Sequence, residues 1–171
     1  MRTMSCLARI TAAGLLLLTS VAQAQATKAQ ATLAAALRGG THVPLGAAIT
    51  AASAAGKPIS ARYEVEDGKL QLSVFIEKDG AYSEIFVDHM TGKVATTDKI
   101  TGGDDMKDAK AQSKAFAKAK STLAAALDKV LAANPGYTAV EIIPVLEGGK
   151  PVAEVTLMKD GQFKAVPQPL G

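Results

Sequence analysis

Two hairpin turns recur along the chain at an offset of 81 residues, and this repeat constrains the fold more than any other feature. Asp-Gly-Lys at 67–69 matches Gly-Gly-Lys at 148–150, and Lys-Asp-Gly at 78–80 matches Lys-Asp-Gly at 159–161. Turns at matched spacing set the length of the chain between them, and the two halves align without gaps. The chain is therefore expected to contain two copies of one small unit, which 171 residues can accommodate.

Apolar and polar residues alternate between these turns, which predicts half-buried β-strands. In the first half, the inward positions of two strands are Ala61, Tyr63, Val65, Leu72, Val74 and Ile76. At the same offset, the second half places apolar residues at Ile142, Leu146, Ala153, Val155 and Leu157. A third strand is expected from 81 to 88, so each half is predicted to form an antiparallel meander.

An amphipathic helix is expected before each meander. One helical face in the first half is lined by Leu45, Ala48, Ile49, Ala52 and Ala55. Gly56 is expected to end this helix. The offset of the turns aligns Val130 with Ile49, which predicts the position of the helix in the second half.

The first half resembles the PepSY family, which is known from bacterial envelope proteins and from the propeptides of secreted metallopeptidases. Five features carry the resemblance: the helix at 45–55, its closing Gly56, the strands on either side of Asp67-Gly68, the turn at Asp79-Gly80, and Asp-His-Met-Thr-Gly-Lys-Val at 88–94. The last segment is similar to the closing Asp-x-x-Thr-Gly-x-Val of the family.

The first copy spans residues 41–97, and the second spans residues 121–171. The second copy is similar through Gly161 but lacks the Asp-x-x-Thr-Gly segment, so it is expected to be truncated, with a short last strand. The resemblance implies an α+β fold of two tandem cystatin-like modules, each a helix packed on an antiparallel β-meander. It also implies a role in binding or restraining a secreted peptidase. The family pattern contains no catalytic residue, so the chain is not expected to be an enzyme.

The N-terminal segment has the layout of a secretion signal. Arg2 and Arg9 precede an apolar run at 12–18, and Ala-Gln-Ala at 22–24 supplies small residues for cleavage. The apolar run is too short to cross a bilayer, which takes about 20 residues. Residues 1–24 are therefore interpreted as a signal peptide cleaved after Ala24. This interpretation implies a periplasmic or secreted protein with no transmembrane anchor after cleavage.

Cleavage after Ala24 would also remove Cys6, the only cysteine, which excludes disulfides and cysteine-ligated zinc from residues 25–171. Arg2 and Arg9 are two of the 19 basic residues, so 17 would remain against 16 acidic ones. Nucleic-acid binding proteins typically carry a basic stripe with aromatic residues between the charges. The balance is near neutral, and the one Lys-rich stretch contains a single Phe and no Arg, so nucleic acid is excluded from the expected partners.

Two segments lie outside the repeats. Residues 25–40 are expected to form a partly helical N-terminal extension, and residues 98–120 a charged linker or helix rich in Lys and Asp. Aspartates precede lysines in this linker, an order that suits a helix dipole. A solvated connecting helix is favoured over a lysine face for anionic lipid or glycan.

Residue types for catalysis or metal binding are scarce. The two histidines, His42 and His89, lie in no metal or nucleophile motif. Asp88 is interpreted as a turn residue rather than as half of a site with His89. No cofactor and no metal are expected. The alternative is a small-ligand or cation site made by carboxylates, either those of Asp104, Asp105 and Asp108 or those of the turns at Asp67, Asp79 and Asp160.

Three aromatic residues share the outward face of the first meander and mark a candidate protein-binding or inter-repeat surface: Phe75, Tyr82 and Phe86. The corresponding face of the second half carries Ile143, Val145, Val152 and Met158. An apolar outer face needs a cover. Two explanations stay open. Either the two sheets cover each other or a homodimer forms, which is favoured, or the surface accepts an extended peptide as an added strand.

These features predict a non-catalytic periplasmic or secreted binding protein whose partner is a protein or peptide, with a secreted peptidase as the class that the resemblance implies. The alternative function is an envelope protein that binds a small ligand or a metal cation through turn carboxylates.

Overall fold

The computed structural model describes residues 19–171, with side chains described from Lys28 onward. Most of the predicted signal peptide, residues 1–24, lies outside the described residues. The described chain is α+β and runs in the order α1 (Thr19–Leu37), α2 (Leu45–Ala52), β1 (Lys57–Glu66), β2 (Lys69–Lys78), β3 (Ala81–Val87), β4 (Val94–Lys99), α3 (Gly103–Phe116), α4 (Leu123–Ala132), β5 (Thr138–Glu147), β6 (Lys150–Lys159) and β7 (Gln162–Pro169).

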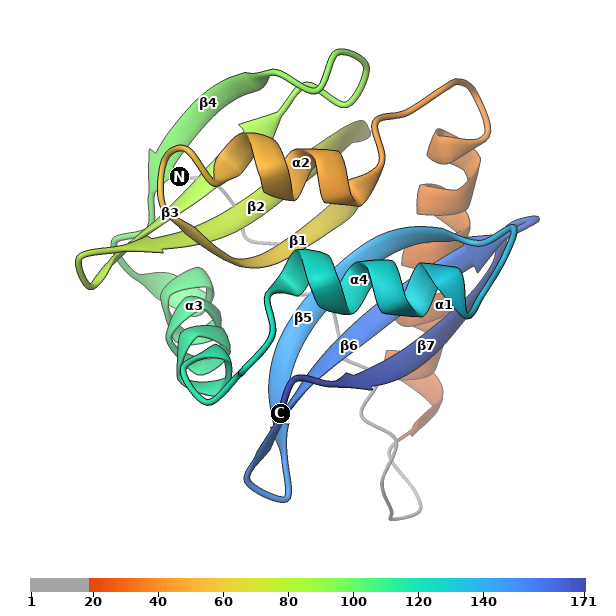
Figure 1. Ribbon diagram of the computed structural model, residues 1–171. Helices are drawn as coiled ribbons and strands as arrows, with labels where there is room; N and C mark the ends of the chain where they lie inside the picture. Colours follow the sequence, from red (N-terminus) through yellow and green to blue (C-terminus); the bar gives the residue numbers. More distant parts are fainter. Residues whose placement is uncertain (1–18) are drawn as a thin grey trace.

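All of these strands form one antiparallel sheet in the order β4-β3-β2-β1-β5-β6-β7 (Figure 1). The two meanders meet edge to edge, because β1 pairs with β5 and sets Ala61 opposite Ile142. These two residues are also equivalent positions of the sequence repeat. A pair of equivalent residues at the centre of an antiparallel junction indicates an approximate two-fold axis through the sheet at that point.

An irregularity in the strands repeats with the same offset. In β1 the register shifts between Pro58 and Ser60, and in β5 it shifts between Ala139 and Glu141. The extra residue in each bulge is apolar and buried: Ile59 is 0% exposed and Val140 is 1% exposed. Since a bulge inserts one residue into one strand, a matched bulge shows that the repeat extends to the detailed backbone path.

Helices α2 and α4 lie side by side on one face of the sheet (Figure 1). Their buried faces have the same spacing: Leu45, Ala48, Ile49 and Ala52 in α2, and Leu123, Ala126, Leu127 and Val130 in α4. Ile49 is therefore the counterpart of Leu127, and the predicted match with Val130 is wrong. The helices are offset by 78 residues and the strands by 81, because α4 is two residues longer than α2 and the link from helix to strand is one residue longer in the second half.

The opposite side of the sheet, called the reverse face below, is covered in part by α3. Gln112 of α3 accepts a buried hydrogen bond of 2.7 Å from the Ser60 hydroxyl in β1. The helix buries Ala109, Gln112, Ala115 and Phe116. The segment is a connecting helix with exposed lysines, as favoured in the sequence, but it is not solvated all round, because one face of α3 packs on the sheet. The expectation that the two sheets cover each other is wrong, since they join edge to edge.

Helix α1 lies behind the sheet in Figure 1. It packs against the core through Leu33 and Leu37, and Ala34 is buried. These residues all follow Ala24, so the predicted cleavage after Ala24, which falls inside α1, would remove none of them.

The last strand of the second half is not short, contrary to expectation. Strand β7 has 8 residues and its counterpart β3 has 7. Beyond β7, the Leu170 N–H donates to the Pro151 carbonyl at 3.0 Å. Pro151 has no N–H to return the bond, and the Leu170 carbonyl instead accepts from the N–H groups of Lys120 and Ser121. Leu170 is fully buried as a result.

Two glycines test the packing of α2 and the loop that follows it. A Cβ atom on Gly56 would lie 3.0 Å from the Glu77 carbonyl oxygen and 3.0 Å from Ile76 Cδ1. We expect Gly56→Ala to lower the free energy of unfolding by about 1–3 kcal/mol in urea titrations, because backbone and core must both shift. The control is Gly46→Ala in α2, where the new Cβ would make an ordinary 3.6 Å contact with Leu127. It should stabilise the protein by up to about 1 kcal/mol through helix propensity. Equal losses in both variants would contradict the packing described here.

Candidate functional site

The three aromatic residues singled out in the sequence lie on the reverse face of β2 and β3. In the strand register, Phe75 faces Glu84, Tyr82 faces Glu77, and Phe86 faces Ser73. Phe75 is only 2% exposed, whereas Tyr82 and Phe86 are half-buried. Phe75 is thus part of the interior, and of the three only Tyr82 and Phe86 reach solvent.

Arg62 lies at the centre of the reverse face, at the junction of the repeats. It pairs with Ser73 of β2 on one side and with Glu141 of β5 on the other. Its Nε atom lies 3.3 Å from Glu64 Oε2, and its guanidinium carbon lies 5.5 Å from the centroid of the Phe75 ring. The side chains of Arg62 and Glu64 are only 24% and 14% exposed. Both residues alternate along β1 with the inward positions Ala61, Tyr63 and Val65, so they face away from the core, yet they are largely shielded from solvent.

Carboxylates outnumber the guanidinium in this region. Burial lowers the pKa of Arg62, but the fields of Glu64, Glu84, Glu141 and Asp105 outweigh burial and raise the pKa overall. Burial is also the main cause of the raised pKa of Glu64 and of Glu141, and the Glu141 carboxylate accepts a 3.0 Å hydrogen bond from the Thr156 hydroxyl. Burial raises the pKa of Glu84 to about 7. We call Arg62 with these four carboxylates the Arg62 cluster. One cation faces four acidic groups, so the cluster favours additional positive charge.

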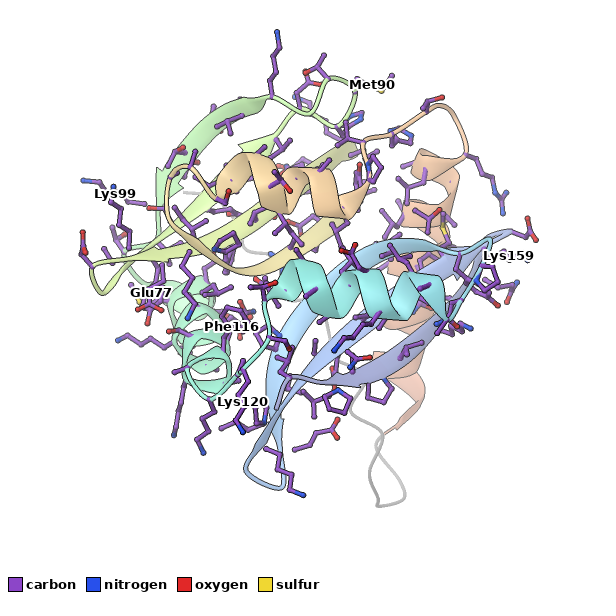
Figure 2. The ribbon with its side chains drawn as sticks, viewed as in Figure 1. Glu77, Met90, Lys99, Phe116, Lys120 and Lys159 are labelled. Atoms are coloured by element: carbon purple, nitrogen blue, oxygen red, sulfur yellow. The ribbon has the colours of Figure 1, made fainter. Side chains whose placement is uncertain are left out.

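A hollow of about 560 Å³ adjoins this cluster where β4 ends and α3 begins. It is lined by Glu84, Thr97, Asp98, Lys99, Ile100, Thr101, Gly102, Gly103 and Asp105. Glu84 and Asp105 belong to both the hollow and the Arg62 cluster, and Asp98 faces Glu84 across the strands. Figure 2 shows the Lys99 side chain extending outward at this end of the molecule. The hollow is thus bordered by three carboxylates and one lysine.

The two edges of the sheet differ in their capacity to pair with another strand. Along an edge strand, every second residue bonds to the neighbouring strand and the others direct their N–H and C=O groups outward. On β7, the hydrogen bond from Leu170 N to Pro151 O shows which residues are which: Phe163, Ala165, Pro167 and Pro169 direct their backbone groups away from β6. Two of these four residues are prolines, which have no N–H to donate, so this edge is blunted. On β4, the hydrogen bond from Ile100 N to Tyr82 O places Ile100 among the residues bonded to β3. Thr97 and Lys99 are therefore outward positions, and each directs its N–H and C=O groups away from β3.

The histidines, which were set aside in the sequence, come together in the structure. His42 lies in the loop before α2 and His89 in the turn after β3, and their Nδ1 atoms are 3.1 Å apart. The sequence contained a weak signal for this contact, since these are the only two histidines in the chain. Spacing along the chain could not reveal it, because the residues are 47 positions apart.

Asp88 is a turn residue, as predicted. Its Oδ1 atom accepts hydrogen bonds from the backbone N–H groups of Met90 at 2.9 Å and Thr91 at 2.8 Å. These backbone hydrogen bonds lower the pKa of the Asp88 carboxyl. The Asp88 carbonyl accepts from the N–H of Gly92, whose φ of 74° requires glycine-like backbone freedom.

The turn carboxylates proposed as an alternative cation site lie at separate hairpins. Asp67, Asp79 and Asp160 have φ angles of 50°, 52° and 52°, and each precedes a glycine that also has positive φ. This conformation is typical of two-residue hairpin turns. Asp104 instead forms an exposed ion pair with Lys107 at 2.9 Å. Within residues 28–171, no three His, Cys, Asp or Glu side chains are grouped so that they could hold a metal ion.

Comparison with known proteins provides no family. No family model matches the chain, and no curated protein matches it. One solved structure is similar: a candidate lipoprotein from Clostridium difficile 630, with 16% identity and a TM-score of 0.40, covering 78% of this chain and 91% of that one. A likeness of this strength supports no conclusion about function. No helix within the described part of the chain is long and apolar enough to cross a membrane.

The Arg62 cluster predicts an unusual pH dependence of stability. Because the pKa of Glu84 is about 7 in the folded protein and near 4.5 ordinarily, the folded state retains a proton that the unfolded state has lost between these pH values. The free energy of unfolding should therefore fall as pH rises from about 4.5 to about 7. Glu84→Gln should reduce this fall and stabilise the protein at pH 8 by on the order of 1–3 kcal/mol. Urea titrations at several pH values measure both effects.

The matched control is Glu147→Gln at the exposed turn between β5 and β6. This variant should keep the pH profile of the wild type. Identical profiles for wild type and Glu84→Gln would show that the Glu84 carboxyl ionises in the ordinary range.

Proposed function

We propose that the protein is an exported, non-catalytic binding protein that takes an extended, positively charged segment of another protein as an added strand along β4. The observation that carries this proposal is the coincidence of an open sheet edge with an acidic hollow at the same place. Strand β4 directs backbone groups of Thr97 and Lys99 outward, and the hollow at its end contains Glu84, Asp98 and Asp105.

The backbone supplies affinity in this mode of recognition. A peptide that adds a strand to a sheet edge forms main-chain hydrogen bonds that any sequence can make. On β4 those bonds would go to Thr97 and Lys99, which alternate with residues bonded to β3. The edge at β7 offers fewer such bonds, because Pro167 and Pro169 lack the N–H group. Strand addition is therefore favoured at β4.

Charge supplies the selectivity. The Arg62 cluster places one guanidinium among four carboxylates, two of which also border the hollow. The raised pKa of Glu84 reflects the burial of its carboxylate, which an added cation would stabilise in its ionised form. A Lys or Arg side chain of the bound segment is the complementary group. The half-buried rings of Tyr82 and Phe86 lie on β3, next to β4, and can contact the aliphatic portion of that Lys or Arg side chain.

The resemblance to PepSY modules indicates a class of partner, a secreted peptidase. The signal-like segment at residues 1–24 indicates a periplasmic or secreted location for such an encounter. The division into two cystatin-like modules belongs to the same hypothesis, with α2 and α4 as the covering helices. In this proposal the second module completes the sheet, while the first carries the binding edge.

Synthetic peptides test the proposed binding mode. The probe is a short labelled peptide of alternating valine and threonine with one central arginine, and its twin carries glutamate at that position. We expect fluorescence anisotropy to show tighter binding of the arginine peptide by about tenfold or more. Thr97→Pro removes an outward N–H without touching the bonds to β3, and it should weaken binding by about tenfold.

The control is Ala165→Pro, the same kind of change at an outward position of β7, and it should leave binding unchanged. Circular dichroism and thermal unfolding establish that both variants are folded. Equal affinity for the two peptides, or equal losses in the two proline variants, would reject strand addition at β4. Crosslinked capture from envelope extracts then identifies the partner class. A peptidase should be captured by the wild type and by Ala165→Pro, and captured less by Thr97→Pro.

A further inference from the structure

The two histidines meet in a geometry that the proposed binding edge does not use. His42 and His89 approach through their Nδ1 atoms at 3.1 Å, with ring centroids 5.1 Å apart and ring planes inclined by 52°. Both side chains are half-buried. A contact between the only two imidazoles of the chain joins the loop before α2 to the turn after β3.

The backbone on both sides of this contact is fixed by hydrogen bonds. The Val43 N–H donates to the His89 carbonyl at 2.8 Å, and the Tyr63 hydroxyl donates to the Val43 carbonyl at 2.5 Å. In the turn, the Asp88 N–H donates to the Lys93 carbonyl at 2.8 Å. The two imidazoles are therefore held in place by the fold around them, and their proximity does not depend on the contact between the rings.

The surroundings of His42 favour its neutral form. Burial, followed by the influence of His89, lowers the pKa of His42. A neutral imidazole carries one proton and one lone pair on its two ring nitrogens. The Nε2 atom of His42 is buried and has no hydrogen-bond partner within the described residues. No protein group therefore fixes the tautomer of His42 through Nε2, and in the tautomer with the proton on Nε2 the Nδ1 lone pair is directed toward His89.

We propose that His42 and His89 form a binding site for a divalent transition-metal cation, with Zn²⁺ as the representative ion. Zinc binds imidazole nitrogen at about 2.0–2.1 Å, so two imidazoles on a tetrahedral ion have nitrogens separated by roughly 3.3 Å. The observed 3.1 Å is within a small ring rotation of this value. Imidazole is a preferred ligand of zinc, copper and nickel, and a weak one for calcium and magnesium.

The remaining coordination positions would be filled by water. Residues 28–171 contain no group of three His, Cys, Asp or Glu side chains that could hold a metal, so the site has two protein ligands. The turn that carries His89 faces solvent, since Met90 is 58% exposed and Thr91 is exposed. A site with two imidazoles and open positions suits an exchangeable cation, and binding would tie the loop before α2 to the turn after β3.

Zinc titration of the full chain, purified without a histidine tag, tests the proposal. We expect calorimetry in a non-chelating buffer to show one Zn²⁺ per chain. His42→Asn and His89→Asn should each weaken binding by about a hundredfold, since loss of a supporting second-shell group alone costs about 10–100-fold. The midpoint temperature of thermal unfolding should rise with zinc concentration in the wild type and not in these variants. Met90→Leu, on the same turn, is the matched control and should bind Zn²⁺ as the wild type does.

Nuclear magnetic resonance of the wild-type chain provides a second measurement that needs no variant. Zinc should shift the ring resonances of both histidines at the same stoichiometry. Absence of zinc binding by the wild type, or undiminished affinity in either asparagine variant, would overturn the proposal and leave a hydrogen bond between the two imidazoles. A shift of only one ring would equally contradict a shared ion. None of these readouts depends on the β4 edge, so this proposal and the proposed peptide binding fail or succeed independently.

Discussion

The antiparallel pairing of β1 with β5 is the interaction on which the rest of the structure depends. Each half alone is a small meander with one covering helix, and small sheets bury too little surface to be stable by themselves. Joining them through Ala61 and Ile142 produces one sheet and brings α2 and α4 together over a shared core. The junction lies close to a two-fold axis, so each repeat presents the same strand to the other.

The same junction accounts for the charge on the reverse face. Arg62 and Glu141 sit opposite one another in the central pair of strands, flanked by strands on both sides and with α3 packed nearby. Charged groups at such a position lose most of their water, and their ionisation depends on one another. The Arg62 cluster carries more carboxylates than cations, and this excess is the basis of the proposed preference for a positively charged partner.

The two candidate sites occupy different parts of the first repeat. The β4 edge and its hollow lie where β4 meets α3, and the histidine pair lies where the turn after β3 meets the loop before α2. The second repeat has neither feature within the described residues. Its outermost strand is β7, where Pro167 and Pro169 blunt the edge, and no histidine occurs in that half of the chain. The repeat has therefore kept a common backbone while its halves differ in chemistry.

Local sequence by itself determined the strands, the hairpin turns and the 81-residue repeat, because alternation and Asp-Gly turns act between near neighbours in the chain. It also placed Phe75, Tyr82 and Phe86 on one face and Asp88 in a turn. Only the tertiary structure decided that the repeats join edge to edge, that Phe75 is buried, and that His42 meets His89. Those outcomes depend on which strand edges pair and which surfaces become covered, and such contacts join residues that are distant in sequence and leave no periodic signal in it.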